Sequence, residues 1–284
     1  MGKLVVCPTP LGNLGDMTQR ALDALREADA VCAEDTRVTG KLLAAFGISK
    51  RLERLDEATL AQRADDIVRR VLDGQVIAYC SDAGMPGVSD PGMRLVRACR
   101  QASAQVEVLP GGTAVATAYV ASGCDNPRFY FGGFFPRKDG ERRSVLEGLR
   151  SLDAVLVFYE SPNRLAGALA ALAEAFPQRE AAVCRELTKL HEEVLRAPLP
   201  DLRDEFARRD AEGGVKGEIV LVVDGPSEGE HAAERADAAD AARERVVELL
   251  GQGMRAKEAA RIAAQECGVS RNDAYRMALE AGRA

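Results

Sequence analysis

The sequence predicts an α/β protein with two α/β lobes followed by a small helical domain. Short runs rich in β-branched residues alternate with segments of helical periodicity, which is typical of βαβ units and of largely parallel sheets. A length of 284 residues suits about two compact domains. The last part of the chain is polar and rich in alanine, as in a helical appendage. We therefore expect one lobe over residues 1–120, a second over 121–225, and a linker with a helical tail over 226–284.

Strands are predicted from short apolar runs, and helices from the amphipathic segments between them. The expected strands are Lys3–Cys7, Ala30–Ala33, Gln75–Cys80, Gln105–Leu109, Phe129–Gly132, Ala154–Tyr159, Ala181–Cys184 and Glu218–Val223. The expected helices are Thr18–Glu27, Leu60–Leu72, Gly92–Gln101, Arg164–Phe176 and Leu202–Arg208. Asp90-Pro91 and Ser161-Pro162 each place a side-chain cap before a proline at the first helical position. A loop around Ala121–Arg128 is expected to separate the lobes.

The tail is expected to form a helix-turn-helix after a linker at Gly225–Ala242. One helix is predicted by an apolar stripe made of Ala259, Ile262, Ala263 and Cys267. Gly268-Val269 ends that helix, and Ser270–Asp273 has the pattern of a capping box that opens the next. Residues 251–284 hold six basic and four acidic side chains, a local positive balance that the whole chain lacks. Two interpretations of the tail are open: it docks RNA, or it only packs and stabilises a dimer.

Composition excludes several classes of protein. No run of eighteen apolar residues is available to span a membrane, and the first residues lack a signal-peptide pattern. Seven cysteines are scattered singly, and the two histidines lie far apart, so we expect reduced thiols, no metal site and a cytoplasmic location. The net charge of −6 argues against a nucleic-acid partner unless a local basic strip contacts it. The best candidate strip joins basic side chains to neighbouring aromatic rings: Arg137, Lys138, Arg142 and Arg143 beside Phe134 and Phe135.

Four loops rich in glycine and proline follow predicted strands. They are Pro8–Asp16, Ala33–Leu43, Ser81–Gly92 and Pro110–Ala114. None contains the glycine pattern of a Rossmann dinucleotide site or of a P-loop. Ligands of open α/β sheets bind beyond the carboxyl ends of the strands, and glycine lets the backbone approach them closely. The loops therefore predict one shared pocket for a nucleoside-like ligand.

Several motifs also resemble a known family. In chain order they are P-T-P-L-G-N-L-G-D, A-E-D-T-R, S-D-A-G-M-P-G-V-S-D-P-G, G-G-F-F-P-R-K, F-Y-E-S-P-N-R-L, C-R-E-L-T-K and K-G-E-I-V-L-V-V. Together they are similar to the RsmI family of ribosomal RNA 2′-O-methyltransferases, within the tetrapyrrole-methylase-like superfamily. The resemblance implies two lobes of the class III methyltransferase type and a homodimer that binds S-adenosyl-L-methionine between its lobes. The implied reaction is 2′-O-methylation of a cytidine ribose in small-subunit (16S) ribosomal RNA, either naked or in an assembled subunit.

The resemblance also implies a set of cofactor-binding residues. They are Pro10, Ser81, Asp82, Ala83, Pro86, Thr113 and Ala114 from the first lobe, with Tyr159 and Leu187 from the second. The chain departs from the family pattern at Val38 and Asn163, where histidine is expected, and at Gly112-Thr113, where proline and serine are expected. These departures argue against a histidine as the proton-transfer group.

The chemistry of the reaction suggests further candidates. A ribose 2′-hydroxyl is a poor nucleophile at neutral pH, so a nearby base would help. The candidate acceptors are carboxylates, namely Glu34, Asp35, Asp82 and Glu160, and the candidate cations for an oxyanion or phosphate are Arg37, Lys138, Arg164 and Lys189. Capping with an ion pair explains Glu34, Asp35 and Arg37 equally well, because acids favour helix N-termini. Asp90 is assigned to capping alone.

Two other functions fit the same sequence. A tetrapyrrole or other small-molecule methyltransferase would use the same cofactor cleft. A nucleic-acid-binding regulator would use the α/β body only to sense a ligand, although such a protein has no need of a second α/β lobe.

Overall fold

The computed structural model describes residues 2–90 and 92–282, and this part of the chain forms two compact units. Met1–Leu146 and Ala154–Asp224 make the first unit, which contains two five-stranded sheets. Glu147–Asp153 and the chain from Gly225 onward make the second unit, which is helical. The expected plan of two α/β lobes and a helical domain is confirmed.

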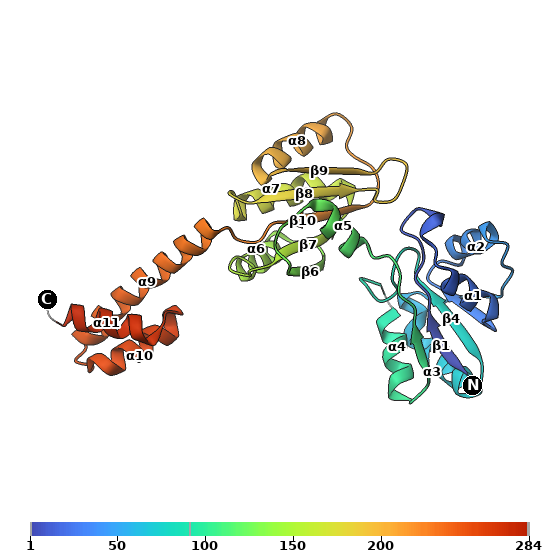
Figure 1. Ribbon diagram of the computed structural model, residues 1–284, viewed down its shortest axis with the longest axis horizontal. Helices are drawn as coiled ribbons and strands as arrows, with labels where there is room; N and C mark the ends of the chain where they lie inside the picture. The colour runs from blue at the N-terminus through green and yellow to red at the C-terminus, as the bar shows by residue number, and fades with distance from the viewer. Residues whose placement is uncertain (1, 91, 283–284) are drawn as a thin grey trace. The chain divides into compact units, whose positions relative to one another are not determined.

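The first sheet is entirely parallel. Its strands are β1 (Lys3–Val6), β2 (Ala30–Ala33), β3 (Leu52–Arg54), β4 (Val76–Cys80) and β5 (Val106–Val108), in the order β3-β2-β4-β1-β5. Helices α1 (Gln19–Glu27) and α2 (Thr36–Ala45) cover one face, and α3 (Glu57–Leu72) and α4 (Gly92–Gln101) cover the other (Figure 1). Since β4, β1 and β5 are neighbours, the loops that follow them meet at one edge of the sheet.

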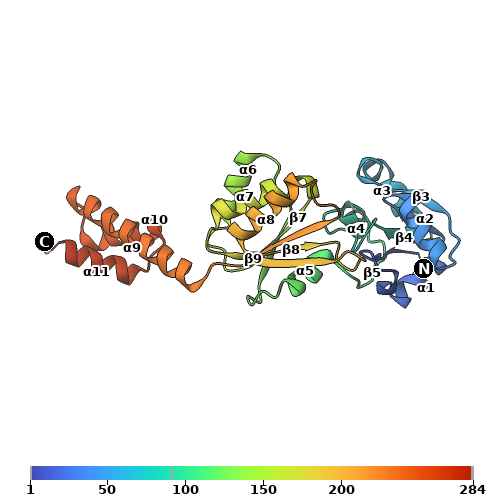
Figure 2. The same ribbon diagram turned by 90° about the horizontal axis from the view of Figure 1, so that it is seen from above.

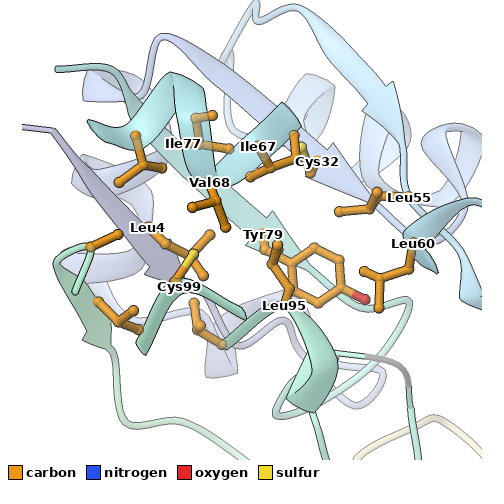
Figure 3. Close-up of a cluster of buried hydrophobic side chains, with 14 residues drawn as sticks. Leu4, Cys32, Leu55, Leu60, Ile67, Val68, Ile77, Tyr79, Leu95 and Cys99 are labelled. Carbon is orange, nitrogen blue, oxygen red and sulfur yellow. The ribbon is translucent and has the colours of Figure 1, made fainter. Parts of the chain in front are cut away.

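Apolar side chains from strands and helices form the core under α3 and α4 (Figure 3). Leu4 and Tyr79 point from the sheet toward Ile67 of α3 and Leu95 of α4, and all four are fully buried. Such burial stabilises the fold by roughly 1.5–3 kcal/mol for each large apolar side chain. This core holds the strand ends, and therefore the loops, in place.

The second sheet is mixed, which corrects the expectation of largely parallel sheets. Its strands are β6 (Phe129–Phe134), β7 (Val155–Glu160), β8 (Glu180–Arg185), β9 (Glu193–Pro198) and β10 (Ile219–Val223), in the order β6-β7-β10-β8-β9. Only β6 and β7 pair in parallel. A short loop joins β8 to β9, and a connection of that length permits only antiparallel pairing. Strand β9 is missing from the predictions because its side chains are half-exposed at the sheet edge and do not form an apolar run.

Helices pack on both faces of the second sheet (Figure 2). Helix α5 (Ala114–Ser122) lies on one face, and α7 (Leu165–Ala175) and α8 (Leu199–Ala211) lie together on the other, while α6 (Asp139–Gly148) follows β6. Val115 and Ala118 of α5 share a core with Val157 and Val222 of the second sheet. Helix α5, which begins within the expected first lobe of residues 1–120, therefore packs in the core of the second sheet. Helix α5 is absent from the predictions because it is apolar nearly all round and has no polar stripe.

Caps fix the ends of several helices. The Asp90 carboxylate accepts the Gly92 N–H at the start of α4, so its assignment as a cap is confirmed. Pro91 lies outside the described residues. Ser161 precedes a 3-10 turn with Pro162 at its first position, but the Ser161 side chain makes no capping hydrogen bond. The predicted proline start is therefore confirmed there, and the predicted side-chain cap is wrong.

The second unit contains helices α9 (Glu228–Gly251), α10 (Ala256–Cys267) and α11 (Arg271–Ala281). Helix α9 occupies most of the expected linker, because its capping box at Ser227 and Glu230 starts the helix early and alanine favours helix. As predicted, α10 ends at Gly268, which adopts the left-handed conformation, and the Ser270 hydroxyl accepts the Asp273 N–H to open α11. The Asp273 carboxylate accepts the Ser270 hydroxyl, so the described contacts form only the Ser270 half of the predicted capping box. Among the described helices, none combines the length and apolarity needed to cross a membrane.

Candidate active site

Three loops of the first lobe are joined to one another at the carboxyl ends of β4, β1 and β5. Thr9 and Gly84 exchange two backbone hydrogen bonds of 2.9 and 3.1 Å, and the Thr9 hydroxyl donates to the Ser81 carbonyl at 3.2 Å. Gly111 lies so close to Pro8 that a Cβ there would be 2.4 Å from the Pro8 Cβ. The predicted gathering of these loops is therefore present in the fold.

A pocket of about 350 Å³ lies between this group of loops and the second sheet, within the first compact unit. We call it the interlobe pocket. Its lining comes from both lobes and consists of Leu11, Ala83, Gly84, Met85, Val88, Thr113, Ala114, Phe134, Tyr159, Glu160, Ser161, Pro162, Gly217, Glu218, Ile219 and Val220. Its volume falls in the range of small-molecule sites, and its walls are mostly apolar side chains and loop backbone.

An adjacent pocket of about 550 Å³ opens beside it, and the two share Leu11, Ala83 and Glu218. The remaining lining of the adjacent pocket is Thr9, Pro10, Gly12, Leu14, Val38, Thr39, Lys41, Leu42, Ala45, Ser81 and Asp82. Ser81 and Thr39 are almost fully buried, and neither hydroxyl has a hydrogen-bond partner among the described residues.

The expected cofactor-binding residues divide between the two pockets. Ala83, Thr113, Ala114 and Tyr159 line the interlobe pocket, whereas Pro10, Ser81, Asp82 and again Ala83 line the adjacent one. Pro86 is buried and lines neither pocket. Leu187 also lines neither, because its side chain packs into the core of the second lobe.

Tyr159 forms a rigid wall of the interlobe pocket. Its ring packs edge-on against Phe131 at 4.9 Å and against Phe134 at 5.6 Å between ring centroids. Burial has the larger effect on the pKa of the Tyr159 hydroxyl, although the backbone N–H of Val115 lowers that pKa. Burial raises the pKa of Tyr159 to about 12, so the phenol stays neutral and serves as a hydrogen-bonding surface.

Glu160 places a carboxylate at the end of β7, with its side chain fully buried. Oε1 accepts the Ser161 N–H at 2.7 Å. Arg164 Nη2 lies 3.1 Å from Oε2, but it donates to the carbonyls of Phe135 and Pro136, so Oε2 has no hydrogen bond among the described residues. Burial raises the pKa of Glu160 despite the Ser161 N–H and Arg164, which both lower it. The carboxylate is therefore a better proton acceptor than an exposed glutamate.

Lys189 lines neither pocket, but it forms an ion pair with Glu218, a residue that lines both. Its ammonium group bonds Glu186 at 2.8 Å and Glu218 at 3.1 Å. Burial lowers the pKa of Lys189, but the two hydrogen bonds to carboxylates outweigh it and raise the pKa overall. The group is therefore a permanent cation beside Glu218, which lines both pockets. Glu218 was not among the predicted site residues, although it belongs to the quoted motif K-G-E-I-V-L-V-V.

Asp35 is a helix cap. Its carboxylate accepts the Arg37 N–H at 2.8 Å and pairs with the Arg37 guanidinium, and this partner lowers the pKa of Asp35. Asp82 in turn accepts the Asp35 N–H at 3.0 Å. Glu34 lines neither pocket, and its pKa is raised by burial and then by Asp82. Of the two interpretations left open for Asp35, the structure supports capping with an ion pair.

Fewer side chains of the expected RNA-binding strip are available for RNA than the sequence predicted. Arg142 donates to the Pro136 carbonyl at 2.8 Å and lies over the Phe135 ring, and Phe135 itself is buried. Arg164 donates hydrogen bonds to the backbone carbonyls of Phe135 and Pro136. Neither arginine is available as expected, and Phe135 cannot stack on a base. The side chains that remain exposed are Arg137, Lys138, Arg143 and Phe134, together with Arg37 near the adjacent pocket.

Two family models cover most of the chain. Tetrapyrrole (Corrin/Porphyrin) Methylases matches residues 3–203, and the RsmI C-terminal HTH domain matches residues 237–282. Ribosomal RNA small subunit methyltransferase I of Escherichia coli O157:H7 is 42% identical over 281 residues, which cover 98% of this chain and 95% of that protein. The chain belongs to this methyltransferase family. The resemblance stated from the motifs is confirmed, and the family makes the protein a methyltransferase that uses a methyl donor.

Another family member and a more distant solved structure are also similar to the chain. The family member of Neisseria meningitidis strain MC58 is 38% identical over 279 residues, covering 98% of this chain and 93% of that protein. A crystal structure of diphthine synthase aligns with a TM-score of 0.62 at 17% identity, covering 78% of this chain and 90% of that one. At that identity the likeness shows the fold alone.

Proposed function

We propose that the protein transfers the methyl group of S-adenosyl-L-methionine to the 2′-hydroxyl of a cytidine ribose in small-subunit (16S) ribosomal RNA. The observation that carries the proposal is the near full-length similarity to ribosomal RNA small subunit methyltransferase I, tail included. The pocket between two lobes, bounded by loops rich in glycine and proline, supports it. The protein is expected to act in the cytoplasm as a homodimer.

The residues of the interlobe pocket suit this donor. Apolar walls and glycine backbone accommodate a nucleoside, and the carboxylate of Glu218, a residue that lines both pockets, complements a positively charged sulfonium. Gly84 lets the donor approach the backbone closely, because it has no side chain. Its φ of 77° is a left-handed conformation, and a Cβ there would lie 3.0 Å from the Leu11 side chain. When bound, the donor supplies an activated methyl group, so the protein needs mainly to align the acceptor. We assign donor binding to Ala83, Thr113, Ala114 and Tyr159, with Pro10, Ser81 and Asp82 beside it.

Glu160 is our candidate for the proton acceptor from the ribose hydroxyl. Glu160 is one of the residues that line the interlobe pocket, its side chain is fully buried, one of its carboxylate oxygens has no hydrogen bond among the described residues, and burial raises its pKa. Lys189 would hold Glu218 in place and stabilise negative charge on the acceptor. Glu34 and Asp82 remain secondary candidates. Asp35 is not proposed, because its carboxylate is engaged in the cap.

Arg37, Arg137, Lys138 and Arg143 are proposed to contact RNA phosphates. All four are exposed cations. Phosphate contacts of this kind position an RNA without reading its sequence.

Transfer of tritium from labelled S-adenosyl-L-methionine tests the function. The acceptors are small ribosomal subunits from a strain lacking the modification, the naked RNA of those subunits, and free tetrapyrroles. We expect label in the RNA or the subunits, recovered as 2′-O-methylcytidine after digestion. Label in tetrapyrroles alone would support the small-molecule alternative, and no label in any of these acceptors would contradict the proposal.

A further inference from the structure

The second compact unit carries a groove on the surface of α10 and α11. Its volume is about 470 Å³, and we call it the tail groove. Its lining consists of Lys257, Ala260, Arg261, Arg271, Asn272 and Tyr275. Lys257 and Arg261 are four residues apart on α10, as are Arg271 and Tyr275 on α11, so each pair shares one face of its helix. All four of these side chains are exposed.

The cations of the tail groove are not neutralised within the unit. In the described part of the tail, Lys257, Arg261 and Arg271 form no ion pair. Two neighbouring acids bond other arginines instead: Glu266 pairs with Arg245 at 2.6 Å, and Asp273 pairs with Arg276 at 2.6 Å. The groove is therefore a local positive site in a chain whose net charge is −6.

The fold of the unit does not depend on these cations. Its core is made of small apolar side chains, including Val246, Ala263, Ala274 and Ala278. Exposed charges contribute little to stability, and like charges that share a groove repel one another. An anionic ligand would remove this repulsion.

The chemistry of the lining indicates the class of ligand. Three cations in a groove match successive phosphates, and the Tyr275 ring, 43% exposed, offers a face on which an unpaired base can stack. Asn272 adds an amide that can hydrogen-bond a base edge. A duplex keeps its bases stacked internally, so this combination favours a single strand.

We propose that the tail groove binds a short single-stranded stretch of the RNA substrate. Its phosphates lie against Lys257, Arg261 and Arg271, and one unpaired base stacks on Tyr275. The proposal rests on the proposed function, because it takes RNA as the substrate. It adds an RNA contact outside the interlobe pocket.

Fluorescence anisotropy with the full-length protein tests the proposal, using a labelled single-stranded RNA of about twenty nucleotides, longer than one binding site. The triple variant K257A/R261A/R271A removes the groove cations. We expect at least about a tenfold loss of affinity and a salt slope that is smaller by about 2, because each phosphate contact on a single strand contributes about 0.7 to that slope.

A matched control removes the same charge from the same unit but outside the groove. It is the triple R235A/R243A/R276A, whose arginines are exposed and pair with Glu228, Asp240 and Asp273. We expect this control to bind RNA within about twofold of the unchanged protein. Tyr275→Phe keeps the stacking face and should bind normally, whereas Tyr275→Ala should lose about fivefold or more.

Equal RNA affinity of the two triples would overturn the proposal. Equal affinity together with a changed sedimentation coefficient of the groove triple would assign the groove to a protein contact instead. Methyl transfer into small subunits separates this proposal from the proposed function. If the unchanged protein methylates subunits but the triples bind RNA equally, only the groove proposal fails. If the groove triple alone loses RNA binding, and neither the unchanged protein nor either triple variant transfers methyl groups, only the proposed function fails.

Discussion

The Lys189 side chain packs on Gly12 so closely that a Cβ at Gly12 would lie 2.3 Å from Lys189 Cγ. Gly12 belongs to the loop after β1, and Lys189 belongs to the loop after β8. This contact joins the two lobes beside the pockets and directs the ammonium group toward Glu218. The positions of these charges therefore depend on a residue without a side chain.

Gly12→Ala should reduce methyl transfer by about tenfold or more, because it displaces Lys189 and misaligns the groups that position the acceptor. Gly167→Ala is the matched control, since a Cβ at that position meets no atom within 4 Å. Steady-state transfer of labelled methyl groups measures the effect, and equal rates for the two variants would contradict the prediction.

Glu160→Gln should reduce methyl transfer roughly 10²-fold, because it removes the proposed proton acceptor. The stability of the Glu160→Gln variant at pH 8 should instead be higher than that of the unchanged protein. Burial raises the pKa of Glu160, so the neutral acid is the form that the fold favours, and stability is lost as pH rises through that pKa.

Thermal unfolding of the Glu160→Gln variant at two pH values checks the sign. Glutamine mimics the neutral acid, so the variant should unfold at a higher Tm than the unchanged protein at pH 8. The difference should disappear at a pH below the ordinary range of a glutamate. A lower Tm at pH 8 would indicate that the ion pair with Arg164 dominates.

Asp35→Ala should lower the Tm by a few degrees, because the first turn of α2 loses its cap. Asp35→Asn should keep most of the stability, since an asparagine oxygen also accepts a backbone N–H. Both variants should retain methyl transfer once folded. A stable Asp35→Asn variant that lacks activity would instead assign Asp35 to the reaction.

Arg137→Ala combined with Lys138→Ala should raise the KM for RNA with little change in kcat or Tm, because both side chains are exposed. Arg142→Ala should lower the Tm, since Arg142 bonds the Pro136 carbonyl and covers Phe135. Titrations at two salt concentrations distinguish the variants. Only the double variant should weaken the dependence of KM on salt.

Local patterns predicted the elements that form from short-range interactions. Helices α1, α3 and α4 of the first lobe, the cap at Asp90 and the turn at Gly268 all depend on neighbours within a few residues. Helices α2, α5 and α6 and strands β3 and β9 were missing from the prediction. Helix α5 is apolar all round, and β9 is a half-exposed edge strand. Their structure depends on what they pack against.

The sequence alone determined most of the strands, the loops that meet at the strand ends and the family, because these depend on periodicity and on contiguous motifs. The tertiary structure decided which charges are available: it placed Phe135 in the core, engaged Arg142 and Arg164 with backbone carbonyls, and brought Glu218 to Lys189. The physical reason is that burial and pairing depend on residues far apart in the chain.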